Sequence, residues 1–376
     1  MHSPSPNPGQ TNGSSYGTGK KQKTSSKASP YIPEMKAIQL PVFALLVSSV
    51  LCQYDYNEYF GYYNLINLQA PTYPVCSVEC DCPLNFPTAM YCNHRKLKSI
   101  PLVPAEIKYL YLHSNQLTGI PNNAFENATG LQWLVLDDNQ ITSDNVGKNA
   151  FSKLKSLKRL YLNRNNLTDV VRGLPKSLKE LRLSSNRISK VGNTLRGLEN
   201  LTTLQLNDNK LKDVGSLSGL KSLTYLDLSG NQLAKLPDDP PEGIEMFYVT
   251  NNKIKSIPKD YFNKIKDLQY LRMSHNEITD DGIPDKIFNI TSLIELDLAY
   301  NDLKSIPLVN ERLENLYLQA NKIDKFTLQS FCRVTGPLDF SSIRHLRLDG
   351  NNISRASVPY DLIRCLPLAS DITLDF

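Results

Sequence analysis

An eleven-position pattern of apolar and polar residues recurs along most of the chain. In its first copy, from Ile107 to Leu117, apolar residues stand at positions 1, 4, 6 and 11, and an asparagine stands at position 9. The pattern starts again after 20 to 30 residues each time, at Leu131, Leu157, Leu178, Leu201, Leu223, Ile244, Leu268, Leu293, Leu313 and Ile343. The asparagine is present in all eleven copies, as Asn115, Asn139, Asn165, Asn186, Asn209, Asn231, Asn252, Asn276, Asn301, Asn321 and Asn351.

Each copy predicts a short strand over positions 3 to 7, whose side chains alternate between two faces. Positions 4 and 6 then point inward, and positions 1 and 11 close the same core from the flanking turns. One copy cannot bury its apolar stripe alone, so neighbouring copies must stack, at about 4.8 Å per strand. This pattern and period are those of leucine-rich repeats. We therefore predict an α/β horseshoe: a solenoid with a parallel β-sheet on its concave side and a mostly irregular or 3-10 convex side.

The repeated asparagine follows the point where each strand ends and its backbone groups lose their partners. A side-chain amide can bond such groups between adjacent coils, whereas an unpaired buried polar group costs about 1–3 kcal/mol. The asparagines are therefore predicted to be buried and structural.

Composition indicates a soluble globular chain, with 40% hydrophobic and 21% charged residues. The formal charge of +5 is concentrated at the start, because residues 1–52 hold five lysines and one acid. The rest has 42 − 5 = 37 basic and 37 − 1 = 36 acidic residues, a net charge of about +1. A nucleic-acid-binding protein would need a stronger basic footprint, so we expect no nucleic-acid partner.

The first 52 residues are predicted to lie outside the folded domain. Residues 1–34 are rich in Ser, Pro, Gly and Lys, which favours disorder. Residues 35–52 place one lysine before an apolar run too short to span a bilayer, which indicates a secretory signal peptide cleaved near Gln53. The alternative is a retained signal anchor. Beyond Gln53 there is no apolar stretch of membrane length, so we expect secretion into the extracellular matrix and no membrane span.

Residues 53–75 form a Tyr-rich acidic tail. Tyrosines beside acids in a secreted, unfolded segment favour sulfation, for which Tyr54, Tyr56 and Tyr59 are the candidates. Gln53, left at the new N-terminus, is a candidate pyroglutamate. The alternative is an unmodified tail that packs loosely on the first repeat.

Six cysteines remain after Cys52 is removed with the signal, and they cluster at the two ends: Cys76, Cys80, Cys82, Cys92, Cys332 and Cys365. In a secreted chain an even number predicts disulfides, and counting alone leaves fifteen pairings open. A zinc site at the first four is disfavoured, because the spacing lacks paired C-x2-C motifs. A solenoid exposes its core at both ends, so we expect residues 76–106 to cap repeats 1–10 (residues 107–323). Residues 324–376 are expected to form a long final repeat with a second cap.

Catalysis finds no support in the sequence, and we expect no enzyme, metal or cofactor. The four histidines after the signal, which we expect to be solvated, stand in no metalloprotease or nucleophile motif: His94, His113, His275 and His345. The outward positions 3, 5 and 7 instead carry Tyr, Trp and Arg, the residue types that dominate protein interfaces. The alternative is that strand propensity alone enriches Tyr and Thr on an exposed sheet face.

The cysteine spacing, the Tyr-rich tail, repeats that alternate near 21 and 25 residues and the long penultimate repeat closed by two cysteines resemble the class II small leucine-rich proteoglycans. The segments Y-C-N-H-R-K-L-K-S-I-P-L-V-P and H-L-R-L-D-G-N-N-I-S carry the likeness, which covers about residues 53–376. The resemblance implies the disulfides Cys76–Cys82, Cys80–Cys92 and Cys332–Cys365. It also implies keratan sulfate on N-linked glycans at four sequons, Asn127, Asn166, Asn200 and Asn289, and Asn352 is an additional candidate glycosylation site. Plain N-glycans are the alternative.

For function, the resemblance implies binding of fibrillar collagen and control of fibril diameter through the concave face. Family members usually carry an aspartate where Thr250 stands, so only a surface is carried over: Asp227, Tyr248, Tyr270 and Arg272. A homodimer through the same face, and cell-surface or growth-factor ligands, are further expected partners. The alternative function is a soluble repeat protein that modulates receptor or innate-immune signalling.

Overall fold

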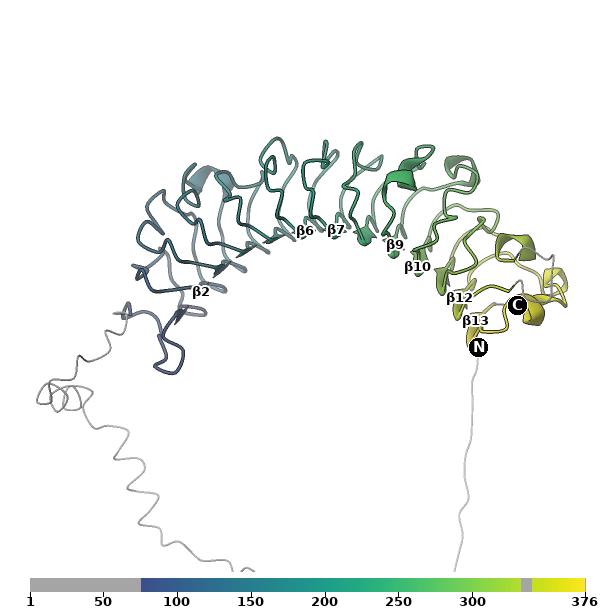
Figure 1. Ribbon diagram of the computed structural model, residues 1–376, viewed down its shortest axis with the longest axis horizontal. Helices are drawn as coiled ribbons and strands as arrows, with labels where there is room; N and C mark the ends of the chain where they lie inside the picture. The colour runs from purple at the N-terminus through teal and green to yellow at the C-terminus, as the bar shows by residue number, and fades with distance from the viewer. Residues whose placement is uncertain (1–75, 333–339, 376) are drawn as a thin grey trace, which may run out of the picture. The chain divides into compact units, whose positions relative to one another are not determined.

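The computed structural model describes residues 76–332 and 340–375. These residues form a parallel sheet of thirteen strands that follow one another in chain order. In Figure 1 the strands line the inner side of an arc and the connecting segments form its outer side, so the predicted horseshoe fold is confirmed. The strands are β1 Ala89–Tyr91, β2 Tyr109–Tyr111, β3 Trp133–Val135, β4 Arg159–Tyr161, β5 Glu180–Arg182, β6 Thr203–Gln205, β7 Tyr225–Asp227, β8 Met246–Tyr248, β9 Tyr270–Arg272, β10 Glu295–Asp297, β11 Asn315–Tyr317, β12 His345–Arg347 and β13 Asp371–Thr373.

The alternation of side chains follows the sequence pattern. Position 4 of each repeat, such as Leu110 and Leu226, is fully buried, and so is position 6, such as Leu112 and Leu228. Each regular strand spans only positions 3 to 5, although backbone hydrogen bonds between adjacent coils continue to position 8, as from the Ser114 N–H to the Asp137 carbonyl at 2.9 Å. The buried leucines form one continuous core along the solenoid.

The repeated asparagines bond adjacent coils to each other, as Asn231 illustrates. Its Oδ1 accepts a hydrogen bond from the backbone N–H of Leu211 in the preceding repeat, at 3.0 Å. Its Nδ2 donates to the carbonyls of Leu206 (3.0 Å), Leu228 (2.9 Å) and Ser229 (3.1 Å). One amide thus satisfies four backbone groups at the point where the sheet ladder ends.

The residue before each of these asparagines adopts a left-handed backbone conformation, which turns the chain out of the strand. The φ angles at this position 8 lie between 50° and 68° in all eleven repeats, at Ser114, Asp138, Arg164, Ser185, Asp208, Gly230, Asn251, His275, Tyr300, Ala320 and Gly350. Only two of the eleven are glycine, so most repeats accept backbone strain at this turn.

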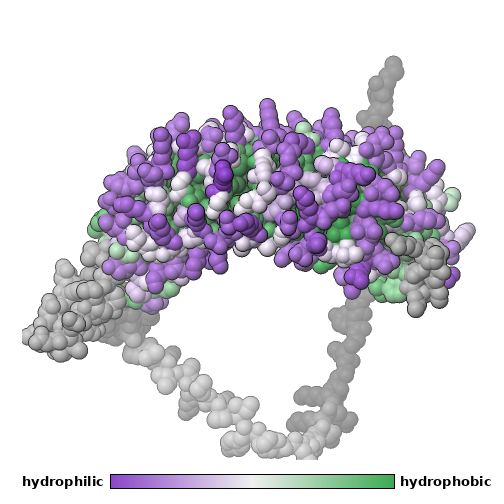
Figure 2. All heavy atoms as spheres, turned by 45° about the horizontal axis from the view of Figure 1, so that its top comes forward, coloured by the Kyte–Doolittle hydropathy of each residue, from purple (hydrophilic) through white to green (hydrophobic). Residues whose placement is uncertain are grey.

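The convex side holds short helical turns and irregular segments. Its elements are the 3-10 turns η2 Ser143–Asn145, η3 Tyr261–Lys264, η4 Asp280–Gly282, η5 Leu328–Ser330 and η6 Arg355–Ser357, and the one-turn helix α3 Leu362–Cys365. Figure 2 shows hydrophilic side chains over much of the face in view, with hydrophobic residues visible between them. Within the described residues, no helix has the length and apolar character needed to cross a bilayer.

Both ends of the sheet carry one strand that the repeat pattern does not mark. β1 pairs in parallel with β2, and its outer side is covered by Asp81, which exchanges two 2.8 Å backbone hydrogen bonds with Tyr91. β13 extends the sheet beyond β12. The disulfides are Cys76–Cys82, Cys80–Cys92 and Cys332–Cys365, the same pairs that the family resemblance implies.

The extension 1–34, the signal peptide 35–52 and the Tyr-rich tail 53–75 lie outside the described residues, together with Gln53 and the three sulfation candidates. Those expectations therefore remain predictions.

Candidate ligand-binding face

The concave face presents one row of side chains at position 5 of successive strands. Strand pairing places Asp227 beside Tyr248, and Tyr248 beside Arg272. The row reads Tyr91, Tyr111, Val135, Tyr161, Arg182, Gln205, Asp227, Tyr248, Arg272, Asp297, Tyr317, Arg347 and Thr373 from the first strand to the last. A Tyr–Arg step therefore occurs three times, and in the second and third cases an aspartate precedes it.

In the middle of the row, Arg272 is held from two sides. Its guanidinium carbon lies 4.7 Å from the centre of the Tyr248 ring, a cation–π distance. Its Nε donates to Glu295 Oε1 at 2.7 Å, and that carboxylate is buried. Tyr225 packs edge-on against Tyr248 with ring centres 5.5 Å apart. Tyr270 stands at position 3 of β9, in register with Met246 and Glu295. The four predicted contact residues thus come from three adjacent strands, and we call them the central face.

Asp227 has an unfavourable environment for its charge. Burial raises the pKa of its carboxyl, although hydrogen bonds from Ser229, including its N–H at 3.0 Å, act in the opposite direction. Asp297 repeats the arrangement: burial raises its pKa, and the Ala299 N–H donates to it at 3.0 Å. Partly buried carboxylates on an open face gain when a ligand supplies a cation or a donor.

Thr250 stands at position 7 of the repeat that contains β8, where the family resemblance leads us to expect an aspartate. Its hydroxyl lies 3.2 Å from the Ser274 hydroxyl across the sheet. The position is therefore uncharged here, which leaves Asp227 and Asp297 as the half-buried acids on this part of the face.

The first strands carry a connected group of aromatic rings that the sequence pattern did not reveal. Tyr91 stacks on Tyr111 with ring centres 4.9 Å apart. Trp133 lies 5.9 Å from Tyr111 and 5.6 Å from Tyr161. Strand alternation predicts that these rings share a face, but contact between them depends on rotamers that no spacing rule gives.

The expectation of a solvated histidine is wrong for His113. The ring is partly buried, and its Nδ1 is covered and has no hydrogen-bond partner. Burial, and then the charge of His94, lower the pKa of His113. The two rings are in edge contact, with centres 5.4 Å apart. Within residues 76–332 and 340–375, no group of three or more His, Cys, Asp and Glu side chains is arranged to hold a metal.

None of the candidate glycosylation sites lies in a strand. Asn127, Asn200 and Asn289 are exposed and precede their strands. Asn166 and Asn352 lie beyond the strand's other end and directly follow a repeated asparagine, which is buried at Asn165 but only partly buried at Asn351. Glycans at these sites would flank the concave face on both sides and leave the row of position 5 open.

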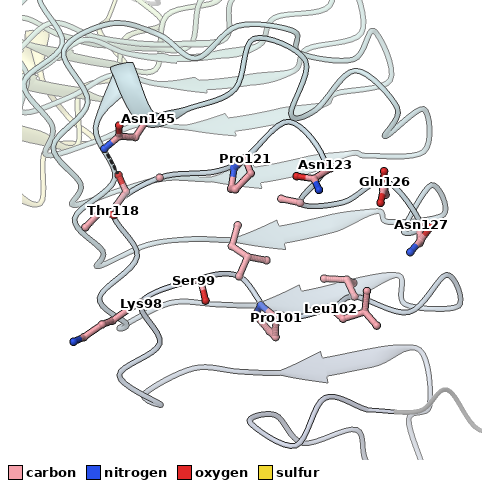
Figure 3. A pocket seen from close by; sticks show the side chains of 14 residues that line it. Lys98, Ser99, Pro101, Leu102, Thr118, Pro121, Asn123, Glu126, Asn127 and Asn145 are labelled. Carbon is pink, nitrogen blue, oxygen red and sulfur yellow. Dashed lines mark hydrogen bonds between the residues drawn. The ribbon is translucent and has the colours of Figure 1, made fainter.

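A hollow of about 500 Å³ lies among the loops of residues 98–103 and 118–127. Figure 3 shows Asn127 at its edge, on the side where the strands begin, and Asn145 bonded to Thr118 on the opposite side. A glycan on Asn127 would stand beside this hollow.

Comparisons with known proteins agree with this architecture. The Leucine rich repeat family model matches residues 105–167, 176–233 and 242–303. A chain in the octameric complex of Latrophilin 3, Unc5D and FLRT2 is similar in structure, with a TM-score of 0.61 and 26% identity over 80% of this chain and 83% of that one. An internalin from Listeria monocytogenes, at 22% identity and a TM-score of 0.55 over 77% of this chain and 86% of that one, shows the same fold.

Comparison with curated relatives identifies the family of the chain within the leucine-rich-repeat proteins. A lumican from Gallus gallus is 54% identical over 342 residues, which are 89% of this chain and 98% of that protein. The chain belongs to the class II small leucine-rich proteoglycans. A Homo sapiens lumican is 51% identical over 85% of this chain and 95% of its own length, and a Homo sapiens fibromodulin is 52% identical over 80% of each. This small leucine-rich proteoglycan is thus a lumican-like matrix proteoglycan built on repeats, and its fold is that of a structural or ligand-binding protein.

Proposed function

We propose that this proteoglycan binds fibrillar collagen through the central face and limits the lateral growth of collagen fibrils. The observation that supports this most is the row Asp227, Tyr248 and Arg272, in which a half-buried acid, a ring and a cation stand on adjacent strands. The row is open to solvent, and all five candidate glycosylation sites lie away from it.

The chemistry of the row suits a triple helix. Collagen winds three extended polyproline-type chains, with glycine at the axis and the other side chains outside. Tyrosine rings are the surfaces on which such proline-rich chains dock. An acidic side chain of a collagen chain could pair with Arg272, and a basic one could pair with Asp227. Because Asp227 is partly buried, its carboxylate gains more from a basic partner than an exposed carboxylate would.

Control of fibril diameter follows from where the glycans would stand. The central face would hold the protein on the fibril surface while N-glycans, extended as keratan sulfate, project from both flanks. Such hydrated chains would keep a second fibril at a distance. The signal peptide, the sulfated Tyr54, Tyr56 and Tyr59 and the pyroglutamate at Gln53 belong to the same proposal of a secreted matrix component.

The proposal is tested by fibril assembly from purified collagen with and without the secreted chain. We expect the chain to sediment with the fibrils and electron microscopy to show thinner fibrils. After enzymatic removal of the N-glycans, binding should remain while the effect on diameter becomes smaller. A chain that stays in the supernatant at every concentration would contradict the proposal.

A second function is capture of a lipid-bearing or cytokine ligand for a receptor. It is favoured by a hollow of about 290 Å³ on the concave face, bounded by Tyr111, Trp133, Val135 and Tyr161 among others. Replacement of Val135 by Trp would fill this hollow. Loss of such a ligand with unchanged collagen binding would separate the two functions. A homodimer formed through the concave face would compete with both.

A further inference from the structure

A concentration of positive charge lies at the beginning of two neighbouring strands, outside the central face. We call it the basic rim and define it by six side chains at or shortly before the starts of β4 and β5: Lys153, Lys155, Lys158, Arg159, Lys176 and Lys179. All six are exposed. They precede or begin β4 and β5, so they border the concave face on the side where the strands start.

The backbone brings the two halves of the basic rim together. The N–H of Lys179 donates to the carbonyl of Lys158 at 2.8 Å, which places these lysines on adjacent coils. Sheet pairing sets Arg159 directly beside Glu180. The rim is therefore one surface and not two separate runs of charge.

Little negative charge neutralises this surface. Glu180 is the acid held against it, and its carboxylate is shared between Arg159, at 3.1 Å, and Arg182, at 2.5 Å. Among the described residues, none of the five lysines forms an ion pair. Because residues 53–376 carry a net charge of only about +1, the rim is a local feature and not a consequence of a basic protein.

The rim also encloses a hollow with an aromatic wall. Its volume is about 360 Å³, and Lys158, Arg159 and Lys179 line it together with Trp133 and Tyr109. The guanidinium carbon of Arg159 lies 4.9 Å from the centre of the Trp133 ring. The Trp133 Nε1 has no hydrogen-bond partner in the structure. The hollow thus combines cations for anionic groups with rings against which a sugar can pack.

Other parts of the same border lack this combination. Before β8 the corresponding segment is acidic, with Asp238, Asp239, Glu242 and Glu245. Before β9, Lys264 and Lys266 are exposed beside Asp267. These two lysines provide a matched control.

We propose that the basic rim binds an extended sulfated polysaccharide, independently of collagen. Exposed lysines act as point charges for a series of sulfate groups, which suits a flexible chain with regularly repeated anions. The aromatic wall adds affinity for the sugar rings, which a purely electrostatic surface would not supply. A polynucleotide offers the same charge, and the experiment distinguishes it.

The Asn200 side chain donates to the Lys176 carbonyl at 3.0 Å, so a glycan on Asn200 would stand beside the rim. The test therefore measures the affinity of the secreted full-length chain, after enzymatic removal of its N-glycans, for a heparin-derived decasaccharide by surface plasmon resonance over a range of salt concentrations. Lys158→Gln with Lys179→Gln should weaken binding by about tenfold and reduce the slope of log affinity against log salt by about 2, because two counterion-releasing contacts are lost. Lys264→Gln with Lys266→Gln should change affinity by less than about twofold.

Two more ligands complete the test, each at the same concentration. A chemically desulfated decasaccharide should not bind, and a single-stranded oligonucleotide of equal charge should bind more weakly. Equal affinity in the Lys158 and Lys179 variant would overturn the proposal. Equal affinity for the desulfated chain or for the oligonucleotide would also overturn it. Collagen binding by the same variant should be unchanged, so failure here is distinguishable from failure at the central face.

Discussion

The guanidinium of Arg272 lies over the ring of Tyr248 on the neighbouring strand, 4.7 Å from the ring centre. Glu295, on the next strand along, fixes the other side of the guanidinium at 2.7 Å. Both side chains are thus oriented before any ligand arrives, which lowers the entropy lost on binding. The same relationship occurs between Arg182 and Tyr161, at 4.6 Å, where no aspartate precedes the pair.

The buried asparagines should be the most sensitive polar residues in the fold. Asn231→Ala would leave the N–H of Leu211 and the carbonyl of Leu206 without their side-chain partner. Because buried polar groups without partners are costly, we expect the free energy of unfolding to fall by about 2–4 kcal/mol in urea titrations. Asn263→Ala, at an exposed asparagine, is the control and should change it by less than about 0.5 kcal/mol. Equal losses would show that burial of the amide has no special role.

At the left-handed position 8, replacing a residue by glycine should raise the stability of the fold, and replacing a glycine by alanine should lower it. Ala320, with φ of 54°, holds a conformation that costs an L-residue energy, so Ala320→Gly should stabilise the fold by about 1 kcal/mol. Gly230→Ala is the reverse experiment: a Cβ there would lie 2.4 Å from Asp208 Oδ1, and we expect a clear loss of stability. Thermal denaturation measures both, and a loss of stability in Ala320→Gly would contradict the account of the turn.

Asp227 should make stability depend on pH. Since burial raises its pKa in the folded state, the folded protein binds this proton more tightly than the unfolded chain does. The protonated carboxyl therefore contributes its full stabilisation of the folded state at pH values below 3.8, the pKa of aspartate in the unfolded chain. This contribution is lost as the pH rises through the higher pKa of Asp227 in the folded state. Asp227→Asn should therefore raise the melting temperature at about pH 7, by about 1–2 °C.

At about pH 3 the two proteins should melt together, because aspartate is then protonated in both states. An increase of the same size at both pH values would point to packing and not to charge. The same substitution should weaken collagen binding, as expected for an acid kept at a site for function at some cost in stability.

The sequence predicted the solenoid because its signal is carried by side chains repeated eleven times. It did not predict β1 or β13. The segment of β1 places the buried Met90 and Cys92 at positions 4 and 6, but Arg95 stands at position 9 where the repeats have asparagine. The regular strands are also shorter than expected, because they end at position 5 and not at position 7.

The sequence predicted which side chains of the candidate site point away from the core. It did not predict which of these side chains contact one another. Alternation places Tyr248 and Arg272 on one face, yet their stacking depends on strand register and on the partner Glu295. The burial of His113 escaped prediction because it results from neighbours in the cap, including His94. Long-range packing of this kind has no local signature.

Collagen affinity in one matched pair of variants tests the central claim most directly. Tyr248→Ala with Arg272→Ala removes the stacked pair of the central face, whereas Tyr161→Ala with Arg182→Ala removes a stacked pair at the same strand positions in repeats 3 and 4. Both variants should remain folded, because position 5 points away from the core. We predict that binding of fibrillar collagen falls at least about tenfold in the first variant, as for loss of an interface hot spot, and changes by less than about threefold in the second. Unchanged binding in the first variant, or equal losses in both, would contradict the assignment of collagen binding to the central face.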